Sequence, residues 1–265
     1  MLCSLAMFSP AWGRASCPAN PAEKELVEHG FQLLAKHLGL SRLKDAIVIE
    51  PTPAFFPDNY DGSLAAAERM FSRTCGYMGV KAGSVRLTFW QDCSEIRLPV
   101  VLEGRRSTRG VAGLYAQNDQ LDEVSLNVAD LRDPEGLVAT MSHELAHHVL
   151  LKRCGLSREE PHMEAVTDLA TIYLGFGVFL SNTLLRRQGW IRGNLEGWSV
   201  RRRGYISPEM AGWGLSLFAW VRRESDPRWS AHLATDGKSY LKQGLRYLQR
   251  TSDSTFPDST SIRAF

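Results

Sequence analysis

The chain has 265 residues, of which 44% are hydrophobic and 23% are charged. These proportions are typical of a folded globular protein and exclude a disordered or collagen-like chain. The 31 Lys and Arg residues against 29 Asp and Glu residues give a net charge of +2. This balance lacks the strong basic field of a nucleic-acid-binding protein, so we expect no nucleic-acid partner.

The first half of the chain predicts two helices followed by a series of strands. Asn20 and Pro21 predict a helix start, and Gly39 predicts its end. A β-branched run predicts a strand at residues 45–50, and Ser63 is placed to cap a helix that reaches about residue 78. Further strands are expected at residues 84–91, 96–103, 111–117 and 124–128, with a basic turn at residues 104–110.

The second half of the chain predicts mainly helices. Asp133 and Pro134 begin a helix that continues to residue 150 or 151. A second, apolar helix is expected at about residues 163–180. Two more are expected at residues 207–223 and 238–250.

The cysteines and the apolar runs bear on cellular location. The five cysteines are irregularly spaced and include no C-x-x-C pair, which argues against a disulfide framework and a structural zinc knuckle. We therefore expect a reducing compartment and a cytoplasmic protein. The most apolar run, residues 169–180, is shorter than the roughly 20 residues of a membrane-spanning helix, so no membrane span is expected. The sequence does not determine the oligomeric state.

The residues that indicate a specific chemistry are His143, Glu144 and His147, which form an H-E-x-x-H motif on a predicted helix. Residues four apart lie about 40° apart around a helix axis, so both imidazoles face one side. Zinc accepts neutral imidazole nitrogen, and two such ligands supply half of a tetrahedral site. Glu144 projects near the same edge, where it can take a proton from metal-bound water. The alternative is that both histidines are ordinary surface or core residues.

A third ligand is expected on the following helix, where Glu164 and Asp168 are also four residues apart. Two carboxylates at the start of an apolar helix are costly to bury unless they are paired or bind a metal. Glu164 as a zinc ligand, with Asp168 accepting a hydrogen bond from a ligand histidine, satisfies both groups. Alternatively, both carboxylates stabilise the helix N-terminus, or a residue of the preceding linker binds the metal. The candidate linker residues are Glu159, Glu160 and His162.

H-E-x-x-H followed by E-x-x-x-D on the next helix resembles the gluzincin group of zinc metallopeptidases. The resemblance implies an α+β, zincin-like fold in which a mixed sheet packs on the metal-binding helix. It also implies that Asp168 bonds to His143, and that residues 111–117 form an antiparallel edge strand beside residues 124–128. A looser resemblance, through residues 167–177 and 204–207, links the chain to uncharacterised bacterial zincin-like proteins.

The resemblance implies zinc-dependent hydrolysis of peptide bonds, with a peptide or protein substrate along edge strand 111–117. Gluzincin peptidases usually add a Tyr or His that stabilises the oxyanion. Tyr205 and His232 are the candidates here, although no motif identifies either of them. The alternative function is therefore a catalytically inactive zincin-like metal-binding or interaction protein.

The expected organisation is a single zincin-like domain at residues 21–250 between two tails, an N-terminal one at residues 1–20 and a flexible C-terminal one at residues 251–265. Within the domain we expect a sheet-containing part (21–133), two metal-binding helices (134–181) and a helical C-terminal part (182–250).

Overall fold

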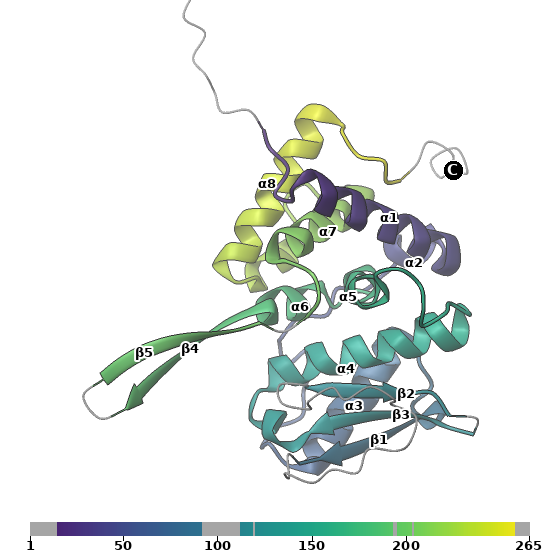
Figure 1. Cartoon of the computed structure of the whole chain (residues 1–265), viewed down its shortest axis with the longest axis vertical. Helices are drawn as coiled ribbons and strands as arrows, with labels where there is room; N and C mark the ends of the chain where they lie inside the picture. The colour runs from purple at the N-terminus through teal and green to yellow at the C-terminus, as the bar shows by residue number, and fades with distance from the viewer. Residues whose placement is uncertain (1–14, 92–111, 119, 193–194, 203, 258–265) are drawn as a thin grey trace, which may run out of the picture.

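The computed structural model describes residues 15–91, 112–118, 120–192, 195–202 and 204–257, with side chains described outside residues 185–203. Within these residues, a mixed three-stranded sheet packs against helices, and the C-terminal half is mostly helical (Figure 1). The expected α+β class is therefore confirmed. None of the described helices combines the length and the apolar character that a membrane crossing requires.

Side-chain caps fix where the main helices begin. Asn20 and Glu23 form a capping box on the first helix, and Ser63, Asp133 and Ser207 cap three later ones. The predicted helix starts at these positions are confirmed. In chain order the helices are α1 (Pro21–Leu38), α2 (Leu40–Lys44), α3 (Leu64–Met78), α4 (Pro134–His148), α5 (Met163–Tyr173), α6 (Gly177–Leu184), α7 (Pro208–Val221) and α8 (Thr235–Thr251).

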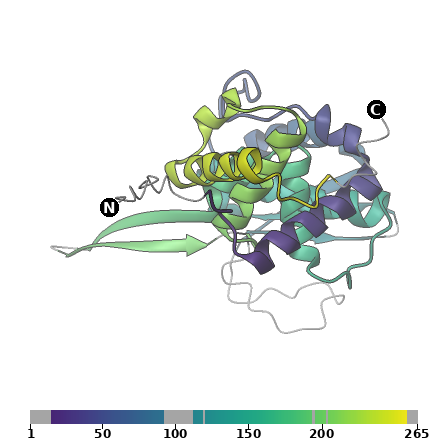
Figure 2. The ribbon, with the colours of Figure 1, turned by 90° about the horizontal axis from the view of Figure 1, so that it is seen from above.

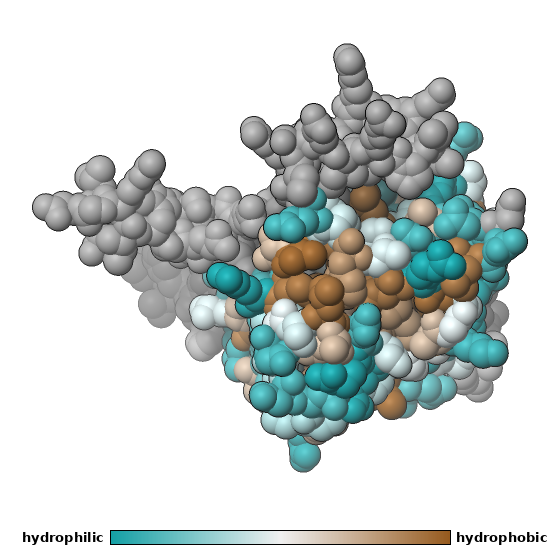
Figure 3. Space-filling view, turned by 90° about the horizontal axis from the view of Figure 1, so that it is seen from below, coloured by the Kyte–Doolittle hydropathy of each residue, from teal (hydrophilic) through white to brown (hydrophobic). Residues whose placement is uncertain are grey.

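The mixed sheet has the strand order β1-β3-β2, with β1 parallel and β2 antiparallel to β3. Val124 and Leu126 on the central strand are fully buried, whereas Glu123 and Ser125 lie on its other face. Among the described strands β2 is an edge and β3 is inner, as predicted. The strands are β1 (Val85–Trp90), β2 (Gly113–Ala116) and β3 (Asp122–Asn127). Seen from the sheet end, apolar residues form a patch in the middle of this face, with hydrophilic residues beside and beneath it (Figure 3).

Helix α4 lies between the sheet on one side and α5 and α6 on the other (Figure 1). Residues 136–148 are all buried except His143, which is half-buried. Helices α1 and α7 pack against α5, and α8 lies outermost, against α7 (Figure 2). Because α4 is covered on nearly all sides, any polar group on it must be paired within the protein.

Residues 163–180, predicted as one helix, form two helices, because the chain breaks between α5 and α6. Gly175 there has a φ of +98°, and a Cβ at this position would collide with the carbonyl oxygen of Ile47. The Ile49 N–H donates to the Gly175 carbonyl. The strand predicted at residues 45–50 is wrong for the same reason, since this extended segment pairs with the helix break instead of another strand.

Residues 182–250, predicted to be helical, contain an antiparallel pair of strands, β4 (Leu185–Arg192) and β5 (Leu195–Arg202). This hairpin extends away from the body of the molecule (Figures 1 and 2). The sequence signal for it is the Gly193-Asn194 dipeptide between two runs that contain Trp, Ile and Val. The strand predicted at residues 96–103 and the turn at 104–110 lie outside the described residues.

Parts of both expected tails pack against helices. The Gln243 side chain on α8 donates to the carbonyl oxygens of Ser16 and Cys17. Beyond α8, Phe256 is 2% exposed and packs edge-on against Phe31 of α1. Residues 15–20 and 251–257 are therefore packed, and only residues 1–14 and 258–265 of the expected tails lie outside the description.

Candidate metal centre

Three side chains from two neighbouring helices converge: His143 and His147 on α4, and Glu164 in the first turn of α5. Their ligand atoms all lie within 4.8 Å of one another. The Nε2 atoms of His143 and His147 each lie 3.3 Å from the same oxygen, Glu164 Oε2. The spacing of four residues puts both imidazoles on one face of α4, and the packing of α4 against α5 brings the carboxylate to them. This group, the triad, could hold a metal ion.

The other nitrogen of each imidazole lies beside an oxygen. His143 Nδ1 is 2.8 Å from Asp168 Oδ1, and His147 Nδ1 is 3.3 Å from Thr167 Oγ1. The Thr167 hydroxyl donates its single hydrogen to the Met163 carbonyl, so it accepts from His147. Both imidazoles therefore carry a hydrogen on Nδ1 and direct Nε2 at Glu164. Two lone pairs and a carboxylate that face one another repel unless a proton or a metal cation lies between them.

The pKa shifts in the triad also indicate that positive charge is favoured there. Burial lowers the pKa of His143, but hydrogen bonds to Asp168 and Glu164 outweigh it and raise this pKa well above its ordinary value. Burial raises the pKa of Glu164, but hydrogen bonds from His143 and His147 outweigh it and lower this pKa. Burial raises the pKa of the neighbouring Glu144. Shifts in opposite directions from the ordinary values, caused by burial and by specific charged partners, are typical of functional sites.

Asp168 holds a loop as well as an imidazole. Its Oδ2 accepts the backbone N–H groups of Tyr205 and Ile206 at 2.6 and 3.2 Å. Gly204 has a φ of +87°, which favours glycine, and a Cβ there would make a tight contact of 3.1 Å with Asp168 Oδ2. The Tyr205 ring stacks on His143, with centroids 5.5 Å apart. The structure therefore brings Tyr205, a predicted oxyanion candidate, to the edge of the triad.

The other candidates take different positions. The His232 imidazole lies 3.4 Å from Glu50 Oε2, so the structure pairs it with that carboxylate and not with the triad. Of the three linker residues, Glu159, Glu160 and His162, none belongs to the metal-competent group found among the described residues.

Glu144 faces the edge strand of the sheet. A Cβ at Gly113 would lie 2.9 Å from Glu144 Oε1 and 2.5 Å from Thr140 Cγ2. Strand β2 can therefore pass this close to α4 only because residue 113 is glycine. The Glu144 carboxylate is buried between the two elements, beside the triad.

The backbone of β2 presents polar groups along its outer edge. The Asn127 N–H donates to the Ala112 carbonyl, which makes these two residues a hydrogen-bonded pair of the antiparallel ladder. Because such pairs alternate, the backbone groups of Leu114 also face β3, and those of Gly113 and Tyr115 face away from it. The outward backbone groups of Gly113 thus lie next to Glu144.

A second polar network beside the triad is not evident from the sequence. His148 Nδ1 lies 2.7 Å from Asp122 Oδ2, and the Tyr115 hydroxyl donates to the same oxygen at 2.8 Å. The Tyr115 ring stacks over His147 with an interplanar angle of 11°. This network ties β2 and β3 to α4. His148 lies 26 residues after Asp122 in the chain, and the only available signal was the extra histidine directly after H-E-x-x-H.

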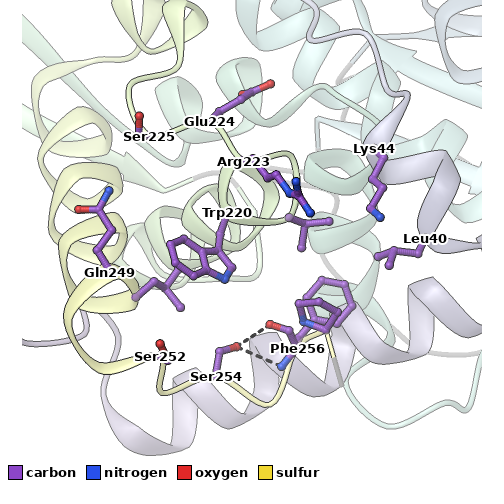
Figure 4. A pocket seen from close by; sticks show the side chains of 13 residues that line it. Leu40, Lys44, Trp220, Arg223, Glu224, Ser225, Gln249, Ser252, Ser254 and Phe256 are labelled. Carbon is purple, nitrogen blue, oxygen red and sulfur yellow. Dashed lines mark hydrogen bonds between the residues drawn. The ribbon is translucent and has the colours of Figure 1, made fainter. Parts of the chain in front are cut away.

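A cavity of about 600 Å³ lies at the C-terminal ends of α2, α7 and α8 (Figure 4). Trp220, Val221 and Phe256 line it together with the cations Lys44 and Arg223. Cations at helix C-termini are stabilised by the helix dipole, so the local structure accounts for both of them. None of its lining residues belongs to the triad, and we assign no function to it.

Comparison of the chain with protein-family models, with curated proteins and with solved structures gave no match. The functional assignment therefore depends on the geometry of the triad and of its surroundings.

Proposed function

We propose that this protein is a zinc-dependent metallopeptidase of the gluzincin type, with His143, His147 and Glu164 as zinc ligands. One observation carries the proposal: two imidazoles, each held at Nδ1, direct their Nε2 atoms to the same oxygen at 3.3 Å. Ligands around a tetrahedral zinc with bonds of about 2.0–2.1 Å are themselves about 3.3 Å apart. Two histidines and a glutamate are also a donor set of catalytic zinc sites, which keep a fourth position open.

Zinc held by this donor set would lower the pKa of a bound water and polarise a substrate carbonyl. Glu144 is the general base in this proposal, since its carboxylate is buried beside the triad and burial raises its pKa toward a range useful for proton transfer. Asp168 and Thr167 are positioning residues that fix the tautomers of the two imidazoles. Tyr205, stacked on His143, is the candidate for stabilising the oxyanion.

The edge strand supports a peptide as the substrate. An extended peptide can pair with the outward backbone groups of Gly113 and with the outward N–H of Tyr115, whose carbonyl accepts from Arg158. Such pairing would bring a peptide bond beside Glu144, because the backbone of Gly113 lies against that side chain. A mixed sheet whose antiparallel edge strand lies along the helix of the two histidines also agrees with a zincin-like fold.

A second candidate function is a zincin-like metal-binding or interaction protein without turnover. The position of His232 favours it, because its pairing with Glu50 leaves Tyr205 as the one predicted oxyanion candidate near the triad. Metal content alone does not separate the two functions, so the test must measure hydrolysis as well.

The test compares the unmodified protein with Glu144→Gln by elemental analysis and by hydrolysis of a peptide library. We expect one zinc per chain in both proteins, because glutamine is nearly isosteric with glutamate and the side chain at this position is not a ligand. Hydrolysis should fall by about 10²–10⁴-fold in Glu144→Gln, which cannot accept the proton. Hydrolysis at an unchanged rate would contradict the role of Glu144, and stoichiometric zinc without any hydrolysis would favour the second function.

A further inference from the structure

Arg158, in the linker between α4 and α5, lies over the end of the edge strand. Its guanidinium carbon is 5.3 Å from the centroid of the Tyr115 ring, and its Nη2 donates to the Tyr115 carbonyl at 3.4 Å. Tyr115 is buried and is held at its hydroxyl by Asp122. The ring and the carbonyl therefore place an exposed cation at a defined position on the strand.

The Arg158 side chain is exposed to solvent. Within the described part of the chain no carboxylate forms an ion pair with Arg158, although Glu159 and Glu160 follow it directly. An incoming anion would thus meet guanidinium N–H groups that no carboxylate of the described residues holds.

The strand geometry relates this cation to a substrate. Gly113, against Glu144, and Tyr115, under Arg158, are two residues apart, which is about 7 Å along a strand. A peptide paired with β2 and with one peptide bond beside Glu144 would place the residue two positions away beneath Arg158. The guanidinium also covers the Tyr115 carbonyl, so the pairing would end at this point.

We propose that Arg158 is a specificity-determining residue that binds a carboxylate of the substrate about two residues from the hydrolysed bond. The inference rests on the proposed function, because it takes β2 as the strand that aligns a peptide. An Asp or Glu side chain and a peptide C-terminus offer the same carboxylate chemistry, and the experiment below separates these two sources.

The experiment measures binding, so that it does not depend on turnover. Zinc-loaded Glu144→Gln protein is titrated with fluorescein-labelled, end-blocked peptides in which a single Glu or Gln is moved through an otherwise uncharged sequence. A third arm uses the Gln peptide with a free C-terminus. We expect at least one carboxylate peptide to bind about 10-fold or more tightly than its neutral partner, as expected for a charge-assisted hydrogen bond.

Adding Arg158→Gln should reduce this preference to within about twofold. The matched control is Arg153→Gln, which removes an exposed arginine that donates to the Gly79 carbonyl instead, and it should keep the preference. Equal affinities for the Glu, Gln and free-terminus peptides, no binding of any peptide, or a preference that persists in Arg158→Gln would each overturn the inference. Arg158-dependent binding of peptides that protein with Glu144 fails to hydrolyse would support this inference while contradicting the proposed function.

Discussion

Helix α4 carries two imidazole–carboxylate contacts of nearly the same geometry. His143 Nδ1 lies 2.8 Å from Asp168, His148 Nδ1 lies 2.7 Å from Asp122, and both carboxylate side chains are 1% exposed. The two contacts differ in which other groups lie beside the histidine. His143 shares Glu164 with a second imidazole, whereas the described residues place no third ligand beside His148 and Asp122. A carboxylate behind an imidazole orients the ring, and only the convergence of further donors makes a metal site.

The largest expected effect separates the two histidines that follow one another on α4. His147→Ala should lose most of the bound zinc, because it removes one of three proposed protein ligands. His148→Ala should keep one zinc per chain and lose stability instead, because it leaves the buried Asp122 carboxylate without that partner. Elemental analysis after exhaustive dialysis measures the zinc content of both variants. Stoichiometric zinc in His147→Ala, or an equal loss in both variants, would remove the distinction.

A smaller effect separates the two carboxylates. Asp168→Asn should weaken zinc binding by about 10–100-fold, the usual cost of losing a group that orients a ligand histidine. Asp122→Asn should leave zinc affinity nearly unchanged and lower the free energy of unfolding of the metal-free protein by roughly 1.5–3 kcal/mol, since Asp122 accepts several hydrogen bonds as an anion.

Competition against a calibrated chelator and urea unfolding measure these two quantities. If Asp122→Asn weakened zinc binding as strongly as Asp168→Asn does, the network of Tyr115, Asp122 and His148 would be part of the metal site.

The smallest effect concerns β2, the edge strand that lies beside both the triad and the His148–Asp122 pair. Gly113→Ala should lower the rate of peptide hydrolysis roughly 10-fold, because the added methyl group displaces the Glu144 carboxylate. Zinc content should not change. The control is Leu114→Ala on the same strand, whose side chain lies on the other face of the sheet. Steady-state kinetics on the same peptide compare the two, and an equal loss in both variants would assign the effect to the strand as a whole.

The sequence was sufficient for the parts of the site that depend on helix periodicity. The four-residue spacing of His143 and His147, and of Glu164 and Asp168, predicts which side chains share a helix face, and the structure places all four together. Thr167 was missed although its position three residues after Glu164 puts it on the same face. Tyr115 and Asp122 could not be found, because their meeting with His148 depends on the packing of a sheet onto α4.

The same limit applies to the fold. Caps such as Asn20 and Asp133 act on their own helix, so the sequence predicts the starts of α1 and α4. β-Branched composition at residues 45–50 indicates extended backbone but not whether a partner strand exists. Gly175 breaks an apolar run only because Ile47 passes beside it, which is a contact between segments far apart in the chain.

The measurement that tests the central claim most directly is anomalous diffraction at the zinc absorption edge from crystals of the purified, zinc-loaded protein. The account predicts one peak bonded to the Nε2 atoms of His143 and His147 and to Glu164, at about 2.0–2.1 Å from each atom. Zinc at His148 and Asp122, zinc bonded through Nδ1, or no peak at the triad would contradict it.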